Sequence, residues 1–134
     1  MFALTMGAGM DTAFPDVCKT PTPAGPVPIP YPNIAMSATT APVAANVLID
    51  CMPSINLASK GLISNGDQVG VAGGVVDSMI MGQANYTLGC LTIMIGGAPA
   101  QRLTSITAQN AAGVTPNCVG MCLTPSQVTV LTLG

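Results

Sequence analysis

The residues of this chain that can do chemistry are few: five cysteines, five aspartates, two lysines and one arginine, with no histidine and no glutamate. Without histidine, neither a Ser-His-Asp triad nor a Cys-His pair can form. A cysteine nucleophile would lack the base that activates it. The aspartates form no obvious pair, and we interpret Asp16 and Asp67 as turn residues. We therefore expect that the protein is not an enzyme.

The cysteines allow three interpretations. Cys118 and Cys122 form a C-x3-C pair, and the remaining cysteines, Cys18, Cys51 and Cys90, are far apart in sequence. Thiolates at the C-x3-C spacing can share a metal ion, and four thiolates complete a tetrahedral zinc site. Disulfides are the second interpretation, although an odd number of cysteines leaves one thiol unpaired. The third is that free cysteines are buried as small hydrophobic residues.

Composition excludes several classes of protein. Only 6% of the 134 residues are charged and the net charge is −2, so nothing predicts binding to nucleic acid. Mean hydropathy is +0.59, but uncharged stretches such as 78–101 contain polar residues and several glycines and predict no membrane span. Residues 1–14 lack the basic start and the long apolar run of a signal peptide. An apolar content of 49% with eight charges favours a chain buried against a partner over a monomer with an uncharged polar surface.

The arrangement of glycine and proline predicts an all-β fold with few or no short helices. Fifteen glycines and twelve prolines would break a helix bundle. Residues 41–52 predict a short helix or, from Val47 to Asp50, a strand. Asn65-Gly66 and Gly96-Gly97 are typical of tight turns, and the seven prolines from Pro15 to Pro32 predict an extended edge or strap rather than a central strand. The strand-like runs are residues 61–64, 74–81, 91–95 and 128–133.

Two weak internal repeats are visible in the sequence. Residues 48–54, LIDCMPS, resemble residues 94–100, MIGGAPA, and residues 18–21, CKTP, resemble residues 122–125, CLTP. Units of this size cannot bury a core alone. The repeats therefore predict a pseudo-symmetric set of hairpins that radiate from a shared point.

Residues 14–33, FPDVCKTPTPAGPVPIPYPN, resemble the opening signature of the PAAR-like domains of bacterial type VI secretion systems. Residues 64–74, 96–102 and 124–130 resemble the glycine-rich centre of that family, its turn ending in arginine and its closing strand. We expect residues 14–134 to be one PAAR-like domain. Residues 1–13 would be a separate segment strapped on its surface, and no effector domain would be fused to it.

The resemblance implies a small all-β cone of short hairpins with pseudo-threefold symmetry. Its base would cap the trimeric β-helical spike, the valine-glycine repeat protein, with one cone per trimer, and its point would sharpen the spike. It also implies a protein made in the cytoplasm and secreted through the type VI system. Loading an effector or its chaperone is an alternative role, and so is tipping another contractile particle or a phage tail.

PAAR-like cones hold a metal near the point with mixed histidine and cysteine ligands, and this chain has no histidine. The resemblance therefore predicts a zinc ion with thiolate ligands, which an aspartate can assist. The shared context of CKTP and CLTP places Cys18 and Cys122 at equivalent points near the tip, the C-x3-C spacing adds Cys118, and the fourth ligand is Cys90 in preference to Cys51. Arg102 either docks on the spike or bonds groups near it in the chain. The predicted docking residues are Arg102 and the proline-rich segment, Pro26, Val27, Pro28, Ile29, Pro30, Tyr31 and Pro32.

Overall fold

The computed structural model describes residues 1–111 and 115–133, and this part of the chain is β structure with one short 3-10 helix, η1 (Ser37–Thr39). The predicted all-β fold with few or no short helices is confirmed. Among these residues, no helical segment has the length and hydropathy of a membrane span. The strands are β1 (Met10–Thr22), β2 (Gly25–Met36), β3 (Thr40–Ala41), β4 (Ala44–Ile49), β5 (Met52–Ser54), β6 (Lys60–Gly61), β7 (Ser64–Asn65), β8 (Ala84–Tyr86), β9 (Cys90–Ile95), β10 (Ala98–Ala100), β11 (Ile106–Gln109) and β12 (Cys118–Thr124).

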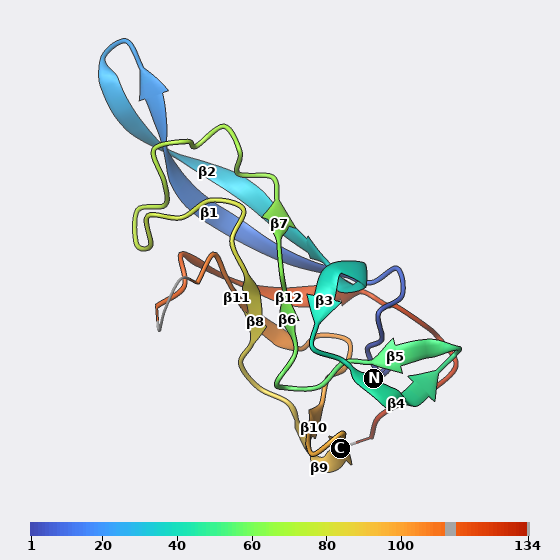
Figure 1. The fold of residues 1–134 in the computed structure, drawn as a ribbon. Coiled ribbons are helices and arrows are strands. Elements are labelled where there is room, and N and C mark those ends of the chain that lie inside the picture. Colours follow the sequence, from blue (N-terminus) through green and yellow to red (C-terminus); the bar gives the residue numbers. More distant parts are fainter. Residues whose placement is uncertain (112–114, 134) are drawn as a thin grey trace.

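Eight of these strands form one antiparallel sheet in the order β3-β6-β8-β11-β12-β1-β2-β7. The long β1–β2 hairpin projects from one end of the molecule, and the hairpins β4–β5 and β9–β10 lie at the other end (Figure 1). Along residues 26–32, β2 pairs with β1, whereas β7 pairs with β2 only at Ile34 and Ala35. The prolines thus lie on an edge, as predicted. In the described part of the chain, no neighbouring strand there needs the N–H groups that proline lacks.

Three short segments meet in a closed triangle of backbone hydrogen bonds. The N–H of Leu4 donates to the carbonyl of Gln101 (3.0 Å), that of Gln101 to Ile55 (3.3 Å), and that of Ile55 to Leu4 (3.0 Å). All three residues are fully buried. A second set of bonds runs round the same three segments in the opposite direction: the N–H of Met6 donates to Pro53, that of Leu57 to Pro99 and that of Leu103 to Phe2. We call residues 2–6, 53–57 and 99–103 the base triangle, and its cyclic pairing defines a pseudo-threefold axis.

Each side of the base triangle carries a hairpin. β4–β5 leads into the segment 53–57, and β9–β10 leads into the segment 99–103. The third hairpin is made from the two ends of the described chain. Here Met1 and Thr132 exchange backbone hydrogen bonds of 3.2 and 2.7 Å, and Phe2 bridges Leu131. We call residues 1–3 and 127–132 the terminal hairpin, and it completes the predicted pseudo-symmetric set.

The irregularities of the hairpins match as well. In β4–β5, Ala44 pairs with Ser54 and Leu48 pairs with the adjacent Pro53, so three residues bulge out. In β9–β10, Cys90 pairs with Ala100, and Met94 pairs with Pro99, which leaves the same bulge. The repeat of residues 48–54 in residues 94–100 is therefore a repeat of structure.

Three sequence-based expectations about elements were wrong. Residues 1–13 are not a surface strap, because Ala3, Leu4 and Thr5 are buried in the base triangle. Residues 74–81 form a loop in which the side chain of Asn117 accepts the N–H of Val76 in place of a strand partner. Residues 128–133 make one isolated bridge, at Leu131, and the regular strand before them is β12.

The inner face of the large sheet is mostly polar and its outer face is apolar. On β12, Cys118 and Cys122 are buried, whereas Val119, Met121 and Leu123 are exposed. Buried polar residues of the other strands include Asp11, Asn33, Thr107 and Gln109. Among the described residues, buried apolar side chains form two clusters, one of Leu4, Ile55, Tyr86 and Cys122 and one of Ala44, Cys90, Ile95 and Ala100, and most of the other buried apolar residues are alanines.

Candidate metal centre and docking base

Asp16, Cys18 and Asp67 converge inside the cone. Their ligand atoms lie within 4.8 Å of one another and all three side chains are fully buried. Cys18 Sγ is 3.5 Å from Asp16 Oδ1 and 3.9 Å from Asp67 Oδ2. Ligand atoms on a tetrahedral zinc ion are about 3.5 Å apart, given metal–ligand bonds of 2.0–2.3 Å. These three side chains, which we call the Asp-Cys centre, therefore stand close to the separations that a metal ion requires.

A tightly packed loop brings Asp67 to β1, the strand that holds Asp16 and Cys18. Gly74 bridges Cys18, and the N–H of Lys19 donates to the carbonyl of Gly73 at 2.8 Å. A Cβ atom at Gly70 would stand 2.3 Å from the Cβ of Cys18. Glycine at position 70 is thus required for the loop to approach closely enough to complete the centre.

Two asparagines hold the carboxylates in position. Asn110 Nδ2 donates to Asp16 and to Asp67, and Asn117 Nδ2 donates to the other oxygen of Asp16. The Oδ1 of Asn110 in turn accepts the N–H of Gly82 at 2.7 Å. Metal-binding carboxylates are oriented by such hydrogen bonds from neighbouring groups, so the residues around the centre fit a metal site.

The thiols of the centre are held in their protonated form. Burial, and after it the nearby Asp16 and Asp67, raise the pKa of Cys18 to about 12. Burial also raises the pKa of Cys118, which hydrogen-bonds to Asp16. A metal ion binds the thiolate, so its binding here must release a proton. Cys118 contacts Asp16 but is not among the side chains whose ligand atoms all lie within 4.8 Å of one another.

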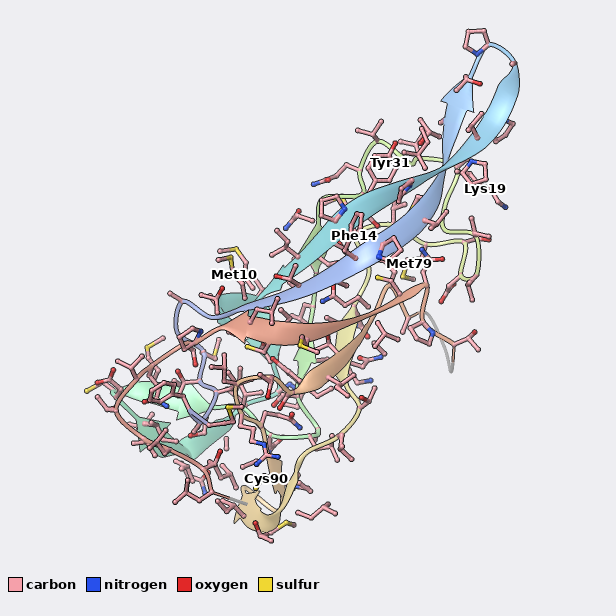
Figure 2. All side chains as sticks on the ribbon, turned by 180° about the vertical axis from the view of Figure 1, so that it is seen from behind. Met10, Phe14, Lys19, Tyr31, Met79 and Cys90 are labelled. Atoms are coloured by element: carbon pink, nitrogen blue, oxygen red, sulfur yellow. The ribbon has the colours of Figure 1, made fainter. Side chains whose placement is uncertain are left out.

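The structure does not assemble the four cysteines predicted as zinc ligands. Cys122 pairs with Asp11 on β1, and Cys18 lies seven residues further along that strand, or about 23 Å at the usual rise per residue. Cys122 packs against Leu4 instead. Cys90 lies in the cluster between the hairpins, and Figure 2 shows it at the opposite end of the molecule from Lys19, the neighbour of Cys18.

The alternative fourth ligand, Cys51, is also far from the centre, because it is exposed at the turn of β4–β5. The similarity between CKTP and CLTP misled the prediction. Cys18 and Cys122 lie on adjacent antiparallel strands, not at equivalent points of a repeat. Of the predicted set, Cys18 and Cys118 are brought together.

The predicted docking residues are likewise divided. Residues 26–32 lie on the projecting β1–β2 hairpin, where Figure 2 shows Tyr31 near Lys19. Arg102 lies in the base triangle, where it bridges Ala3 and its N–H donates to Ser105 Oγ. No single surface therefore contains both groups.

Comparison with known proteins identifies the family. Residues 9–120 match the model of the toxin PAAR-like domain. The chain belongs to this family. It is 34% identical over 113 residues to the DNase toxin Tse7 of Pseudomonas aeruginosa strain PAO1, and the match covers 78% of this chain and 29% of the toxin. The PAAR-like domain thus spans less than a third of that curated relative. No solved structure matches it significantly.

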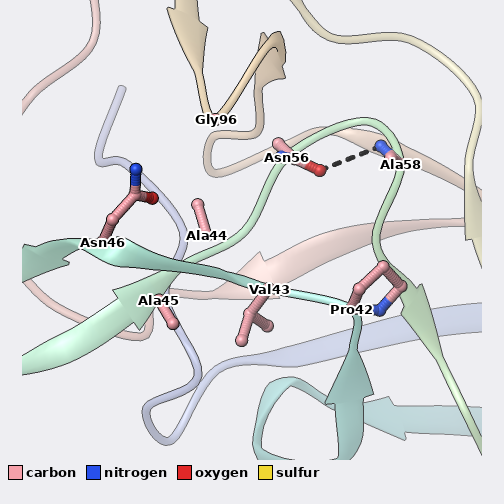
Figure 3. Close-up of a pocket in the computed structure, with 8 residues that line it drawn as sticks. All are labelled: Pro42, Val43, Ala44, Ala45, Asn46, Asn56, Ala58 and Gly96. Atoms are coloured by element: carbon pink, nitrogen blue, oxygen red, sulfur yellow. Dashed lines mark hydrogen bonds between the residues drawn. The ribbon is translucent and has the colours of Figure 1, made fainter.

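The base of the PAAR-like domain presents apolar residues at equivalent positions. Leu48, Met94 and Leu131 are 61%, 59% and 55% exposed, and each lies opposite an equivalent residue of the base triangle, Pro53, Pro99 or Phe2. A groove of about 590 Å³ lies between β4 and the β9–β10 turn, lined by residues that include Val43, Asn46 and Gly96 (Figure 3). Three similar apolar sides therefore surround the pseudo-threefold axis of the domain.

Sequence reasoning allowed an aspartate to assist the thiolates but did not identify Asp16 or Asp67, and it missed the apolar residues of the base. Asp16 and Asp67 were interpreted as turn residues, although they are the only acids in the signature and in the glycine-rich centre. In a chain without histidine, aspartate is the remaining side chain that readily completes a mixed site with cysteine. Leu48 and Met94 each precede a turn by two residues in the two repeats. This shared position was the sequence signal that could have identified the apolar residues of the base.

Proposed function

We propose that this PAAR-like domain caps the blunt end of the trimeric β-helical spike of a type VI secretion system and docks through its base. The observation that carries the proposal is the set of exposed apolar residues at equivalent positions, Leu48, Met94 and Leu131. A trimer offers three identical surfaces around its axis. One chain with three similar sides can make equivalent contacts with all of them.

The opposite end of the domain suits a point. The β1–β2 hairpin projects away from the base (Figure 1), and residues 26–32 alternate proline with other residues. Proline fixes the backbone in an extended path and lowers the entropy of the chain. The projecting hairpin is therefore stiff without needing a core of its own.

The domain serves, in this proposal, to deliver a toxin. Its family is described as the toxin PAAR-like domain, and the region that matches this chain makes up 29% of the DNase toxin Tse7. Delivery requires no catalysis by the domain itself, and we assign it none. The buried thiols of Cys18 and Cys118, with their raised pKa values, are poor nucleophiles. Secretion through the type VI system from the bacterial cytoplasm is part of the same proposal.

We assign zinc to the Asp-Cys centre, with Asp16, Cys18 and Asp67 as ligands and Cys118 as the fourth. Two carboxylates and two thiolates form a donor set that zinc accepts in tetrahedral geometry. A structural ion there would tie the loop that holds Asp67 to β1 below the projecting hairpin. This part of the proposal stands or falls separately from docking.

Co-expression with a trimeric valine-glycine repeat protein tests the capping function. The mass of the purified complex should correspond to one PAAR-like chain and three spike chains. Three PAAR-like chains per trimer, or no complex, would reject the proposed docking. A complex with the spike of a phage tail or another contractile particle, and none with the type VI spike, would favour the alternative role as the tip of that particle.

A further inference from the structure

The turns of two base hairpins share one geometry. β4–β5 turns through Asp50 and Cys51, with φ of 54° and 63°, and β9–β10 turns through Gly96 and Gly97, with φ of 60° and 85°. Positive φ at both central residues is typical of the two-residue type I′ turn. Each turn thus joins its paired strands through two residues.

The two strands of the terminal hairpin are spaced as if a two-residue turn joined them, although no turn connects Met1 to Thr132. Met1 and Thr132 exchange both backbone hydrogen bonds, as the pair that closes such a turn does. In the sequence, two residues follow Thr132. A peptide bond from residue 134 to Met1 would therefore leave two residues between the paired strands, as in the other two hairpins.

We propose that the three hairpin tips are interchangeable points at which this domain can be joined to another polypeptide, such as a toxin domain. The base triangle is closed in a circle, and one of its three hairpins is already held by hydrogen bonds alone. The pairing of Met1 with Thr132 shows that a tip needs no covalent turn. The inference concerns the domain itself and does not depend on docking to a spike.

The two covalent tips have the surroundings that such a junction needs. Asp50, Cys51, Gly96 and Gly97 are exposed, and a Cβ atom added at Gly97 would meet no atom within 4 Å. Both tips lie at the base end of the molecule (Figure 1). The projecting β1–β2 hairpin at the opposite end would stay uncovered.

The exposed loop of residues 66–82 has different surroundings. In the loop of residues 66–82, the N–H of Val76 donates to Asn117 Oδ1 at 2.9 Å, and the same asparagine holds Asp16. A break beside Val76 would release the loop from the Asp-Cys centre. This loop therefore supplies a matched control.

Circular permutants of the full chain test the proposal. In each, residue 134 is joined directly to Met1, and new ends are opened between Asp50 and Cys51, between Gly96 and Gly97 or, as the control, between Val76 and Asp77. The melting temperatures of the first two should lie within about 5 °C of that of the natural chain, a change of about 1 kcal/mol. The control should melt at least 10 °C lower or show no cooperative transition.

Two outcomes would overturn the proposal. Loss of cooperative melting in either tip permutant would show that the tips are not interchangeable, and a control as stable as both would show that position does not matter. If a permutant is insoluble, a flexible linker of about 10 residues is inserted at the same position of the natural chain. The linker should leave the melting temperature unchanged at the two tips and lower it at Val76, and equal effects at all three positions would also overturn the proposal.

Discussion

Leu48 and Met94 occupy the same position in two different hairpins. Leu48 faces Pro53 across β4–β5, Met94 faces Pro99 across β9–β10, and each follows a three-residue bulge. Both side chains are more than half exposed. Two segments 46 residues apart thus present equivalent apolar contacts on one base.

Replacing either residue with aspartate should weaken binding to the spike. Burying a leucine or methionine side chain contributes about 1.5–3 kcal/mol, so Leu48→Asp and Met94→Asp should each raise the Kd at least about 10-fold. Titration of the spike protein with each variant measures the change.

Val27→Asp is the control for this prediction, because Val27 is 41% exposed on the projecting hairpin. It should leave the Kd unchanged. A loss of binding in Val27→Asp without one in Leu48→Asp would place docking on the proline-rich segment instead.

Elemental analysis should find one zinc ion per chain, and the two aspartates should matter as much as the cysteine. Cys18→Ser and Asp67→Asn should lose the metal because each removes a ligand of the Asp-Cys centre. Cys90→Ser should retain it because Cys90 packs against Ile95. If Asp67→Asn retains the metal and Cys90→Ser loses it, the result would instead favour the all-thiolate site predicted from the sequence.

Truncation of Leu4 should destabilise the whole domain. Leu4 is fully buried in the base triangle, and removal of a buried leucine side chain costs about 2–5 kcal/mol of unfolding free energy. Leu62, which is 53% exposed, is the matched control and should lose little. Urea denaturation compares Leu4→Ala with Leu62→Ala, and equal losses would mean that the first residues only cover the surface.

Asp11 should make the domain less stable as the pH rises from acid to neutral. Burial raises the pKa of Asp11 above its unfolded value of about 3.9. The folded state therefore favours the neutral acid, whose contribution is complete below the unfolded pKa and is lost as the pH rises through the folded pKa.

The substitution Asp11→Asn isolates this effect because an amide oxygen still accepts the hydroxyl of Tyr86, which bonds Asp11 at 2.9 Å. With a chelator present, unfolding free energies should be similar near pH 4, and the variant should become the more stable protein toward pH 7. Parallel curves for the two proteins would show that Asp11 is not responsible.

Local patterns predicted the elements that local forces determine. Gly96 and Gly97 marked a turn because glycine adopts positive φ without strain, and the alternation in residues 91–95 marked the strand that became β9. The prolines marked an edge because they lack a donor. These signals depend only on neighbours in the sequence.

Features that depend on distant contacts were not predictable in this way. Leu4 is buried because Gln101 and Ile55 surround it, and nothing in residues 1–6 indicates those partners. Asp67 joins Cys18 because Gly70 permits close packing, which sequence spacing cannot show. Residues 128–133 have a strand pattern, yet they find one bridged partner at the other end of the chain.

The terminal hairpin also sets the timing of folding during synthesis. Met1 leaves the ribosome 131 residues before Thr132, and their hydrogen bond spans all of these positions. The base triangle can close once residue 103 has emerged, whereas the terminal hairpin must wait for Thr132, and folds dominated by such distant contacts form slowly. Until then the apolar residues of the base are exposed in a nascent chain with little charge, a state that invites aggregation. A nascent-chain chaperone, or a spike trimer already assembled nearby, would shorten that interval.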